Sequence, residues 1–210
     1  MKRRQNRQIG KHPPNPKKQL TKQYKDTQPP TQPHIISHVL YMGSLTNFEI
    51  EDVAKHYKIS LNDCCMKDEL TGSPRDGCYI INLESSSQGG GTHWTSLIIK
   101  NQIAVFVDSF GAPPSTEIRD FVKKRRGMHL AFNNEIIQDL HSENCGYFCL
   151  YLCYFVRNET NPDLVSAVDA FTRLFREQTT LNDGILRQLF RNIPDKHPPK
   201  PILKLLRQKN

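Results

Sequence analysis

Cys145 stands where a polar stretch of the chain gives way to an apolar one. The three residues before it are polar, and Gly146 and a nearly unbroken apolar run follow, which predicts a buried helix that begins at the thiol. A helix N-terminus favours the thiolate over the thiol through the helix dipole and free backbone N–H groups. Cys145 is therefore a candidate nucleophile. Cys149 and Cys153 follow at helical spacing and are expected to be core residues.

A nucleophilic cysteine needs a base, and His93 has the most suitable setting among the histidines. It follows three glycines and stands just before the apolar stretch 95–100, which predicts a strand. A second strand is predicted at 103–108, and the short turn between them indicates an antiparallel hairpin. His93 then lies at the same end of the hairpin as Asp108, which could accept its hydrogen bond and orient the ring. Taken singly, His93 could be a surface residue and Asp108 could cap the turn ahead of Gly111.

Gln138 could complete such a site by donating hydrogen bonds to an oxyanion. It precedes Cys145 by seven residues and follows two isoleucines. At the end of a short strand its amide could project toward the thiol, and the backbone N–H of Cys145 would be the second donor. Gln138 alone carries little information. The four residues together indicate acyl transfer through a cysteine nucleophile.

The elements expected around these residues define an α+β fold. Thr46 and Glu49 form a capping-box pattern, and Leu45 and Ile50 are placed as a hydrophobic staple, so a helix should begin there. The predicted helices cover 45–57, 114–126, 145–156, a segment that begins at 161, and about 181–191, and the predicted strands cover 78–83, 95–100, 103–108, 129–132 and 135–138. We expect one central, mostly antiparallel sheet with helices packed around it.

Charge and composition divide the chain into three segments. Residues 1–36 hold nine Lys and Arg against one Asp, which accounts for the whole net charge of +8, so the remainder of the chain is neutral. This arm has almost no apolar residues and is expected to be disordered. Residues 37–193 form the predicted domain, and 194–210 are a basic, Pro-broken tail. The arm is expected to contact DNA or to serve in nuclear import, the alternatives being a solubilising tail or a removable pro-segment. The basic residues expected to contact phosphates are Lys2, Arg3, Arg4, Arg7, Lys17 and Lys18.

The cysteines and apolar runs indicate a reducing compartment. Cys64 and Cys65 are adjacent and three others share one helix face, unlike the disulfide framework of a secreted protein. The basic N-terminus has no apolar segment of a signal peptide. The longest apolar run, 148–156, is too short to cross a bilayer. We expect a soluble, monomeric protein found inside cells or virions.

Three stretches together resemble a known active-site signature. They are GGGTHW at 89–94, VFVDSFG at 105–111, and the seven-residue step from Gln138 to Cys145. In this combination they resemble the active site of the adenovirus-type cysteine endopeptidase (adenain) family. That family belongs to the wider group of the SUMO-deconjugating proteases, in which the Gln-to-Cys step is usually one residue shorter. Similar proteases occur in virophages and Polinton-type elements. The resemblance covers roughly residues 44–192.

The resemblance implies a specific role for each matched residue. Cys145 would be the nucleophile, His93 the base, Asp108 the orienting acid, and Gln138 with the Cys145 N–H the oxyanion donors. The residues that would border the substrate cleft are Trp94, Gly89, Gly90, Gly91, Asn144 and Gly146. Family substrates carry small residues, typically Gly, at the scissile bond. They would be capsid and core precursors cleaved during particle maturation, in the host cell, virus factory or nucleus and in the virion.

One departure concerns activation. The adenovirus enzyme is activated by a peptide that forms a disulfide with a cysteine between the acid and the Gln, and residues 109–137 contain no cysteine. That covalent form of activation is not expected here. No cofactor is expected for the chemistry, while DNA or another peptide could still act as an activator, DNA through the arm.

Three alternatives stay open. A deconjugating isopeptidase for ubiquitin-like modifiers would use the same catalytic residues, and an acyltransferase could share the fold. A basic nucleic-acid-binding protein with an inactive protease-like core would need the 1–36 arm but not Cys145. A metal site at His141, Cys145 and Cys149 has helical spacing, but the polar residues 142–144 argue against a continuous helix, and no metal is expected.

Overall fold

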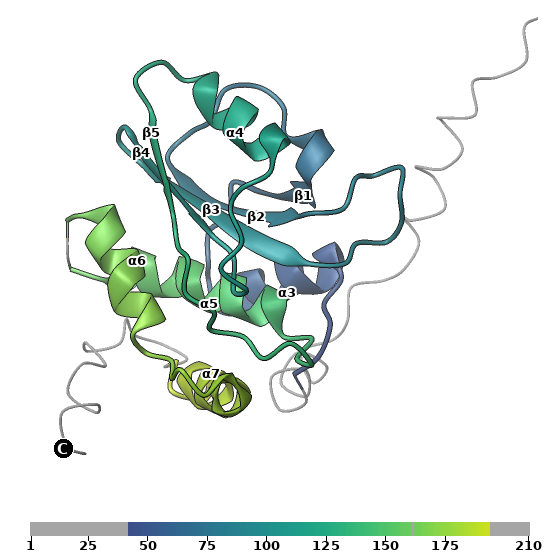
Figure 1. Cartoon of the computed structure of the whole chain (residues 1–210), viewed down its shortest axis with the longest axis vertical. Coiled ribbons are helices and arrows are strands. Elements are labelled where there is room, and N and C mark those ends of the chain that lie inside the picture. Colours follow the sequence, from purple (N-terminus) through teal and green to yellow (C-terminus); the bar gives the residue numbers. More distant parts are fainter. Residues whose placement is uncertain (1–41, 161, 194–210) are drawn as a thin grey trace, which may run out of the picture. The chain divides into compact units, whose positions relative to one another are not determined.

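The computed structural model describes residues 42–160 and 162–193 (Figure 1). The predicted arm at 1–36 and tail at 194–210 lie outside the described residues, and with them all the predicted phosphate contacts. Within the described part, the predicted α+β class is confirmed. No helix among these residues is both long and apolar enough to cross a membrane.

In the described part of the chain, five strands form one mixed sheet, in which they lie in sequence order. They are β1 (Asp63–Met66), β2 (Gly77–Asn82), β3 (Trp94–Lys100), β4 (Ile103–Val107) and β5 (His129–Phe132). The three central strands are antiparallel neighbours, whereas the edge strands β1 and β5 run parallel to β2 and β4. The hairpin of β3 and β4 is the one predicted, while β1 was not predicted.

The predicted strand at 135–138 is wrong. Instead of joining a ladder, this segment crosses the end of the sheet, and the N–H groups of Ile137 and Gln138 both donate to the Ser109 carbonyl, at 2.9 and 3.0 Å. Two amides that share one acceptor bend the chain away from strand geometry. Of the apolar pair at 136–137, Ile137 is buried and Ile136 is exposed.

Among the described residues, five helices and two short 3₁₀ turns surround the sheet. They are α3 (Asn47–His56), η1 (Lys67–Glu69), α4 (Thr116–Lys123), α5 (Cys145–Asn158), α6 (Leu164–Thr172), η2 (Thr179–Leu181) and α7 (Asn182–Arg191). The predicted capping box of α3 is confirmed, with the Glu49 N–H donating to Thr46 Oγ1 and the Thr46 N–H to Glu49 Oε2. Asp163 is the N-cap of α6. Helix α5 begins at Cys145, as the polar-to-apolar step predicted.

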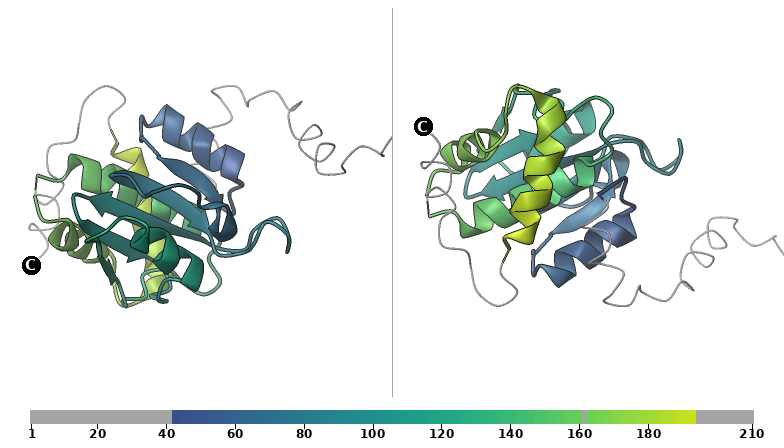
Figure 2. Two further views of the ribbon diagram at one scale, coloured as in Figure 1. Left: turned by 90° about the horizontal axis from the view of Figure 1, so that it is seen from above. Right: turned by 90° about the horizontal axis from the view of Figure 1, so that it is seen from below.

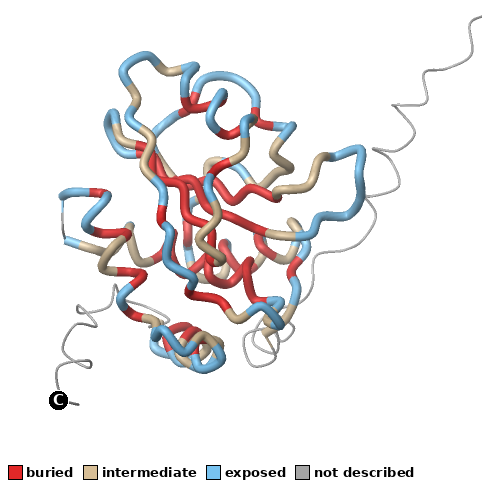
Figure 3. Tube along the Cα trace, viewed as in Figure 1, coloured by how far each residue is buried: buried red, intermediate tan, exposed pale blue. Residues whose placement is uncertain are grey.

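The helices cover both faces of the sheet (Figures 1 and 2). Side chains alternate along the strands, so that Ile98 and Val105 face α5 while Leu97 and Phe106 face α4. Helix α5 lies against the sheet, and α7 crosses its outer side (Figure 2). Enclosed in this way, α5 is buried from its first residue through Tyr154 (Figure 3). The thiol at its start therefore has a rigid support.

Candidate active site

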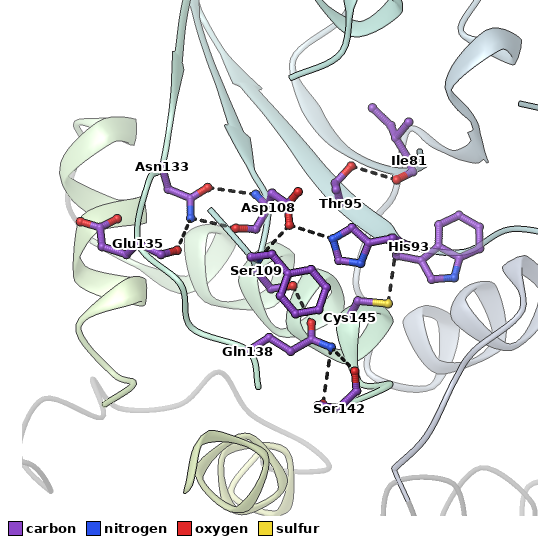
Figure 4. A network of polar contacts seen from close by, with 12 residues as sticks. Ile81, His93, Thr95, Asp108, Ser109, Asn133, Glu135, Gln138, Ser142 and Cys145 are labelled. Atoms are coloured by element: carbon purple, nitrogen blue, oxygen red, sulfur yellow. Dashed lines mark hydrogen bonds and ion pairs between the residues drawn. The ribbon is translucent and has the colours of Figure 1, made fainter. Parts of the chain in front are cut away.

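His93 and Asp108 meet at one end of the β3–β4 hairpin. The two strands pair from Lys100–Ile103 to Ser96–Val107, so the residue before β3 and the residue after β4 come together at the open end. Nε2 of His93 lies 2.7 Å from Oδ1 of Asp108 (Figure 4). The contact predicted from the register is confirmed.

Asp108 is 1% exposed and is held by several donors. Its Oδ1 also accepts the N–H of Phe110 at 2.8 Å. Asn133, just after β5, clamps its backbone: Oδ1 accepts the Asp108 N–H and Nδ2 donates to the Asp108 carbonyl, both at 2.9 Å. A buried carboxylate needs such partners to offset its lost hydration. The sequence offered no signal for Asn133 beyond its place at a strand end.

The Cys145 thiol lies on the other side of the His93 ring from Asp108 (Figure 4). Its Sγ accepts the backbone N–H of Trp94 at 3.5 Å, and its interaction with the His93 side chain is one of the causes that raise the pKa of His93. Cys145 is also the first residue of α5, where backbone N–H groups have no partner within the helix. These donors favour negative charge at the sulfur. The Trp94 N–H contact was not predicted, because it joins residues far apart in sequence.

The surroundings of His93 keep its ring protonated at neutral pH. Burial by itself lowers its pKa, but the hydrogen bonds to Asp108 and Cys145 outweigh burial and raise the pKa to about 9. The ring also stacks on Phe110, with centroids 4.7 Å apart and planes 28° from parallel. Phe110 was not predicted to act in the site. The stack and the bond to Asp108 together fix the orientation of the imidazole.

Gln138 is 1% exposed, and its amide is oriented by three contacts. The Ser109 hydroxyl lies 2.6 Å from Oε1, and Nε2 donates to the Ser142 carbonyl at 2.7 Å. A carbonyl can only accept, so the nitrogen must lie on the side of Ser142. One hydrogen of the amide is used there. Nε2 also lies 3.5 Å from the Ser142 hydroxyl oxygen, and Gln138 lines the same cleft as Cys145.

These side chains line an open cleft with a volume of about 320 Å³. The lining residues are Ser44, Leu45, Gly91, Thr92, His93, Trp94, Phe110, Gln138, Leu140, Ser142, Glu143 and Cys145. The Trp94 indole N–H donates to the Leu45 carbonyl at 2.7 Å and anchors one wall. A second cavity of about 230 Å³ lies on the β1 side of Trp94 and includes Cys64 and Cys65.

The three predicted cleft glycines lie in different settings. Gly91 borders the cleft with φ of +98°, and a Cβ there would lie 2.6 Å from Asn82 Nδ2, so glycine is required. Gly90 borders the second cavity, and space around it is open. Gly89 lines neither cavity, and a Cβ there would lie 2.9 Å from the Glu84 carboxylate.

Asn144 and Gly146 flank the nucleophile but do not line the cleft. Asn144 is the buried N-cap of α5, where its carbonyl accepts the N–H groups of Tyr147 and Phe148. Gly146 faces the core, where a Cβ would lie 3.2 Å from Leu45 Cδ1 and 3.3 Å from Leu45 Cβ. The structure thus places both residues in the support of the site.

Substituting Gly146→Ala is expected to lower the free energy of unfolding by about 1–3 kcal/mol, as overpacking of a core does. Leu45 cannot easily move away, because its carbonyl holds the Trp94 indole. Urea unfolding followed by circular dichroism measures the change. Gly184→Ala in α7 is the control, since a Cβ there meets nothing within 4 Å. It should be neutral or stabilise by up to about 1 kcal/mol. Equal stability of the two variants would contradict the packing explanation.

The described residues contain no group of three or more His, Cys, Asp and Glu side chains that could hold a metal ion. His141 does not share a helix with Cys145 and Cys149, because His141 lies in a turn ahead of α5.

Comparison with known proteins adds little. No protein-family model and no curated protein matches the chain. Among solved structures it is similar to the crystal structure of the ASFV pS273R protease, with 17% identity and a TM-score of 0.40, over 64% of this chain and 68% of that chain.

Proposed function

We propose that the protein is a cysteine protease with Cys145 as nucleophile. One observation carries the proposal: His93, bonded to Asp108 and with its pKa raised by both Asp108 and Cys145, lies with Cys145 at an open cleft that also contains the Gln138 amide. The order acid, imidazole, thiol is the arrangement that activates a cysteine for attack on a carbonyl.

Acylation begins with the Cys145 thiolate, which attacks the carbonyl carbon of the scissile bond. The carbonyl oxygen becomes an oxyanion, which accepts hydrogen bonds from Gln138 Nε2 and the Cys145 N–H. The protonated His93 gives its proton to the leaving nitrogen, and the C–N bond breaks. The products are a free amine and a thioester on Cys145.

Deacylation returns the enzyme to its starting state. The neutral His93 takes a proton from a water molecule as the water attacks the thioester carbonyl. The C–S bond breaks, the thiolate re-forms beside the imidazolium, and the acid product leaves. Asp108 orients the ring and stabilises the imidazolium at both ends of the cycle.

The resemblance to the adenain family supports a finer proposal about the substrate. We propose that it is a viral capsid or core precursor cleaved next to small residues such as glycine during particle maturation. The basic arm at 1–36 would hold the enzyme on DNA in the infected cell and the virion, and the chemistry would need no cofactor. A monomer suffices, because one chain contains every proposed catalytic residue.

Substrate tests separate the protease from its alternatives. Fluorogenic peptides with glycine at the scissile bond should be cleaved. A glycine joined to a lysine side-chain amine tests the isopeptidase, and acetyl-CoA with a protein acceptor tests the acyltransferase. Cleavage of the lysine-linked substrate alone would overturn the endopeptidase proposal.

Alkylation by iodoacetamide tests the activated thiol without any substrate. An ordinary thiol has a pKa of about 8.5, so it reacts slowly at neutral pH. Cys145 should react roughly 10–100 times faster than such a thiol there, because the imidazolium of His93 favours the thiolate. Mass spectrometry quantifies the labelling of each cysteine across pH, with and without DNA. Labelling that requires DNA would assign the arm a role in activation.

Cys64 and Cys65 provide the reference within the same chain. Both are partly exposed, yet burial and nearby carboxylates raise the pKa of Cys65 to about 12 and that of Cys64 further. They should remain unlabelled while Cys145 reacts. If Cys145 reacts no faster than a free thiol at neutral pH in either condition, the proposed function fails.

A further inference from the structure

Ser142 links the start of helix α7 to both proposed oxyanion donors. Its carbonyl accepts a hydrogen from Gln138 Nε2 at 2.7 Å. Its hydroxyl accepts the N–H of Asn144, the cap of the helix that begins with Cys145, at 3.2 Å. The same hydroxyl donates to Oδ1 of Asp183, in the first turn of α7, at 2.8 Å. One serine thus connects a carboxylate outside the cleft with the Gln138 amide and with the start of α5.

Two further bonds attach the same segment to the chain at 179–183. Asn182 is fully buried and uses its whole amide: Nδ2 donates to the Ile137 carbonyl at 2.9 Å and to the Arg176 carbonyl at 2.8 Å, and Oδ1 accepts the Arg176 N–H at 2.9 Å. The Thr179 hydroxyl donates to Asp139 Oδ2 at 3.3 Å. The segment 137–142 is therefore tied at three points, although it has no helix or strand of its own.

We propose that Asp183 is a positioning residue for the oxyanion site, acting through Ser142, with Asn182 fixing the other end of the same segment. The inference rests on the proposed function, because it assigns these residues to the stabilisation of an oxyanion. An irregular segment held by few backbone bonds opens easily unless side chains restrain it. Donors displaced by a fraction of an ångström stabilise a tetrahedral intermediate much less. The start of α7 thereby sets the acylation rate from outside the cleft.

Two reactions of the same thiol separate positioning from activation. Iodoacetamide alkylates the thiolate by displacing iodide at carbon and forms no oxyanion. N-acetylglycine p-nitrophenyl ester acylates it through a tetrahedral oxyanion and releases p-nitrophenolate, which is followed by absorbance. Loss of one oxyanion donor lowers the rate by about 10²–10³-fold in known enzymes, so a displaced donor in Asp183→Ala should slow acylation by roughly 10-fold or more. Alkylation of Cys145 should stay within about twofold of the wild type, because the His93 pair is untouched.

Asp183→Asn distinguishes the bond to Ser142 from a general effect of charge. Asparagine keeps an oxygen that can accept the Ser142 hydrogen but loses the negative charge at the start of α7. It should restore acylation to within about threefold of the wild type. If Asp183 served only the helix dipole, the Asn and Ala variants would behave alike, which would overturn the inference.

Asp163→Ala is the matched control. Asp163 also accepts a serine hydroxyl at a helix start, that of Ser166 in α6, and neither Asp163 nor Ser166 lines the cleft. It should lower the melting temperature without changing either reaction. Should Asp183→Ala fail to fold, Ser142→Ala removes the same bond from the other side, with the same expected split between acylation and alkylation.

The failures of the inference and of the proposed function are distinguishable. Slow alkylation of wild-type Cys145 contradicts the protease itself. Fast alkylation with undiminished acylation in folded Asp183→Ala and Ser142→Ala contradicts only the positioning role. Equal loss of both reactions would also overturn it, since the site as a whole would then have been damaged.

Discussion

Replacing Cys145 with alanine is expected to abolish peptide cleavage, a loss of at least about 10⁴-fold, as removal of a nucleophile does in other triad enzymes. No other thiol can take its place. Cys149 lies one turn deeper in α5 and is 4% exposed, and burial raises its pKa well above the ordinary value. The assay is cleavage of a glycine-containing fluorogenic peptide by purified protein.

Cys149→Ala is the control for this substitution. It removes a thiol of the same helix from the core and should lower the free energy of unfolding by about 1 kcal/mol. The cleft is unchanged, so peptide cleavage should persist. Substantial cleavage by a folded Cys145→Ala variant would remove the basis of the mechanism. The binding-protein alternative, in which only the 1–36 arm matters, would then be favoured.

Replacing His93 with alanine is expected to lower peptide cleavage by about 10³-fold or more, because the thiol loses its base and the leaving nitrogen loses its acid. The same variant should lose the fast alkylation of Cys145 at neutral pH. Both are measured on one preparation, with circular dichroism to verify the fold. Near-full cleavage by His93→Ala would contradict the assignment of the base.

The pH profile follows from the pKa of His93. That pKa is raised to about 9 from the ordinary value of about 6.5, so the imidazolium persists across neutral pH. Acylation needs this proton for the leaving nitrogen, and its rate should fall as pH rises through about 9. The charged His93 also stabilises the folded state. Its contribution to the free energy of unfolding is complete below pH about 6.5 and, like the acylation rate, is lost as pH rises through about 9.

Asp108→Asn should move this alkaline limb to lower pH. Among the contacts that raise the pKa of His93, the hydrogen bond to Asp108 has the largest effect. The neutral amide of asparagine stabilises an imidazolium less than a carboxylate does. Cleavage should fall less than in His93→Ala, because the ring remains to exchange protons. An unshifted alkaline limb would show that another group sets it.

Much of the fold followed from local patterns. The polar-to-apolar step placed the start of α5 at Cys145, and the capping box placed the start of α3 at Thr46. The contact of His93 with Asp108 was also predictable, because a short turn determines the register of a hairpin. Each of these signals lies within one window of about 15 residues, the range over which periodicity and turn chemistry act.

The edge strand β1 and the path of residues 135–138 were harder to predict from the sequence. Strand β1 was missed because its four residues, Asp63–Met66, show no alternation of apolar and polar side chains. The segment 135–138 has the composition of a strand, but its N–H groups find the Ser109 carbonyl instead of a ladder. Pairing partners of such short segments are decided by the whole sheet.

The sequence by itself singled out Cys145, His93 and Asp108, since each stands at the end of an element that local patterns define, whereas Gln138 was chosen from a strand at 135–138 that does not form. Only the tertiary structure decided what holds them: the Trp94 N–H on Cys145, Asn133 on Asp108, and Asp183 behind Ser142. It also placed Gly146 against Leu45. These are single contacts between residues far apart in the chain. A single contact has no period and no preferred spacing, so it exists only once the sheet and helices have packed.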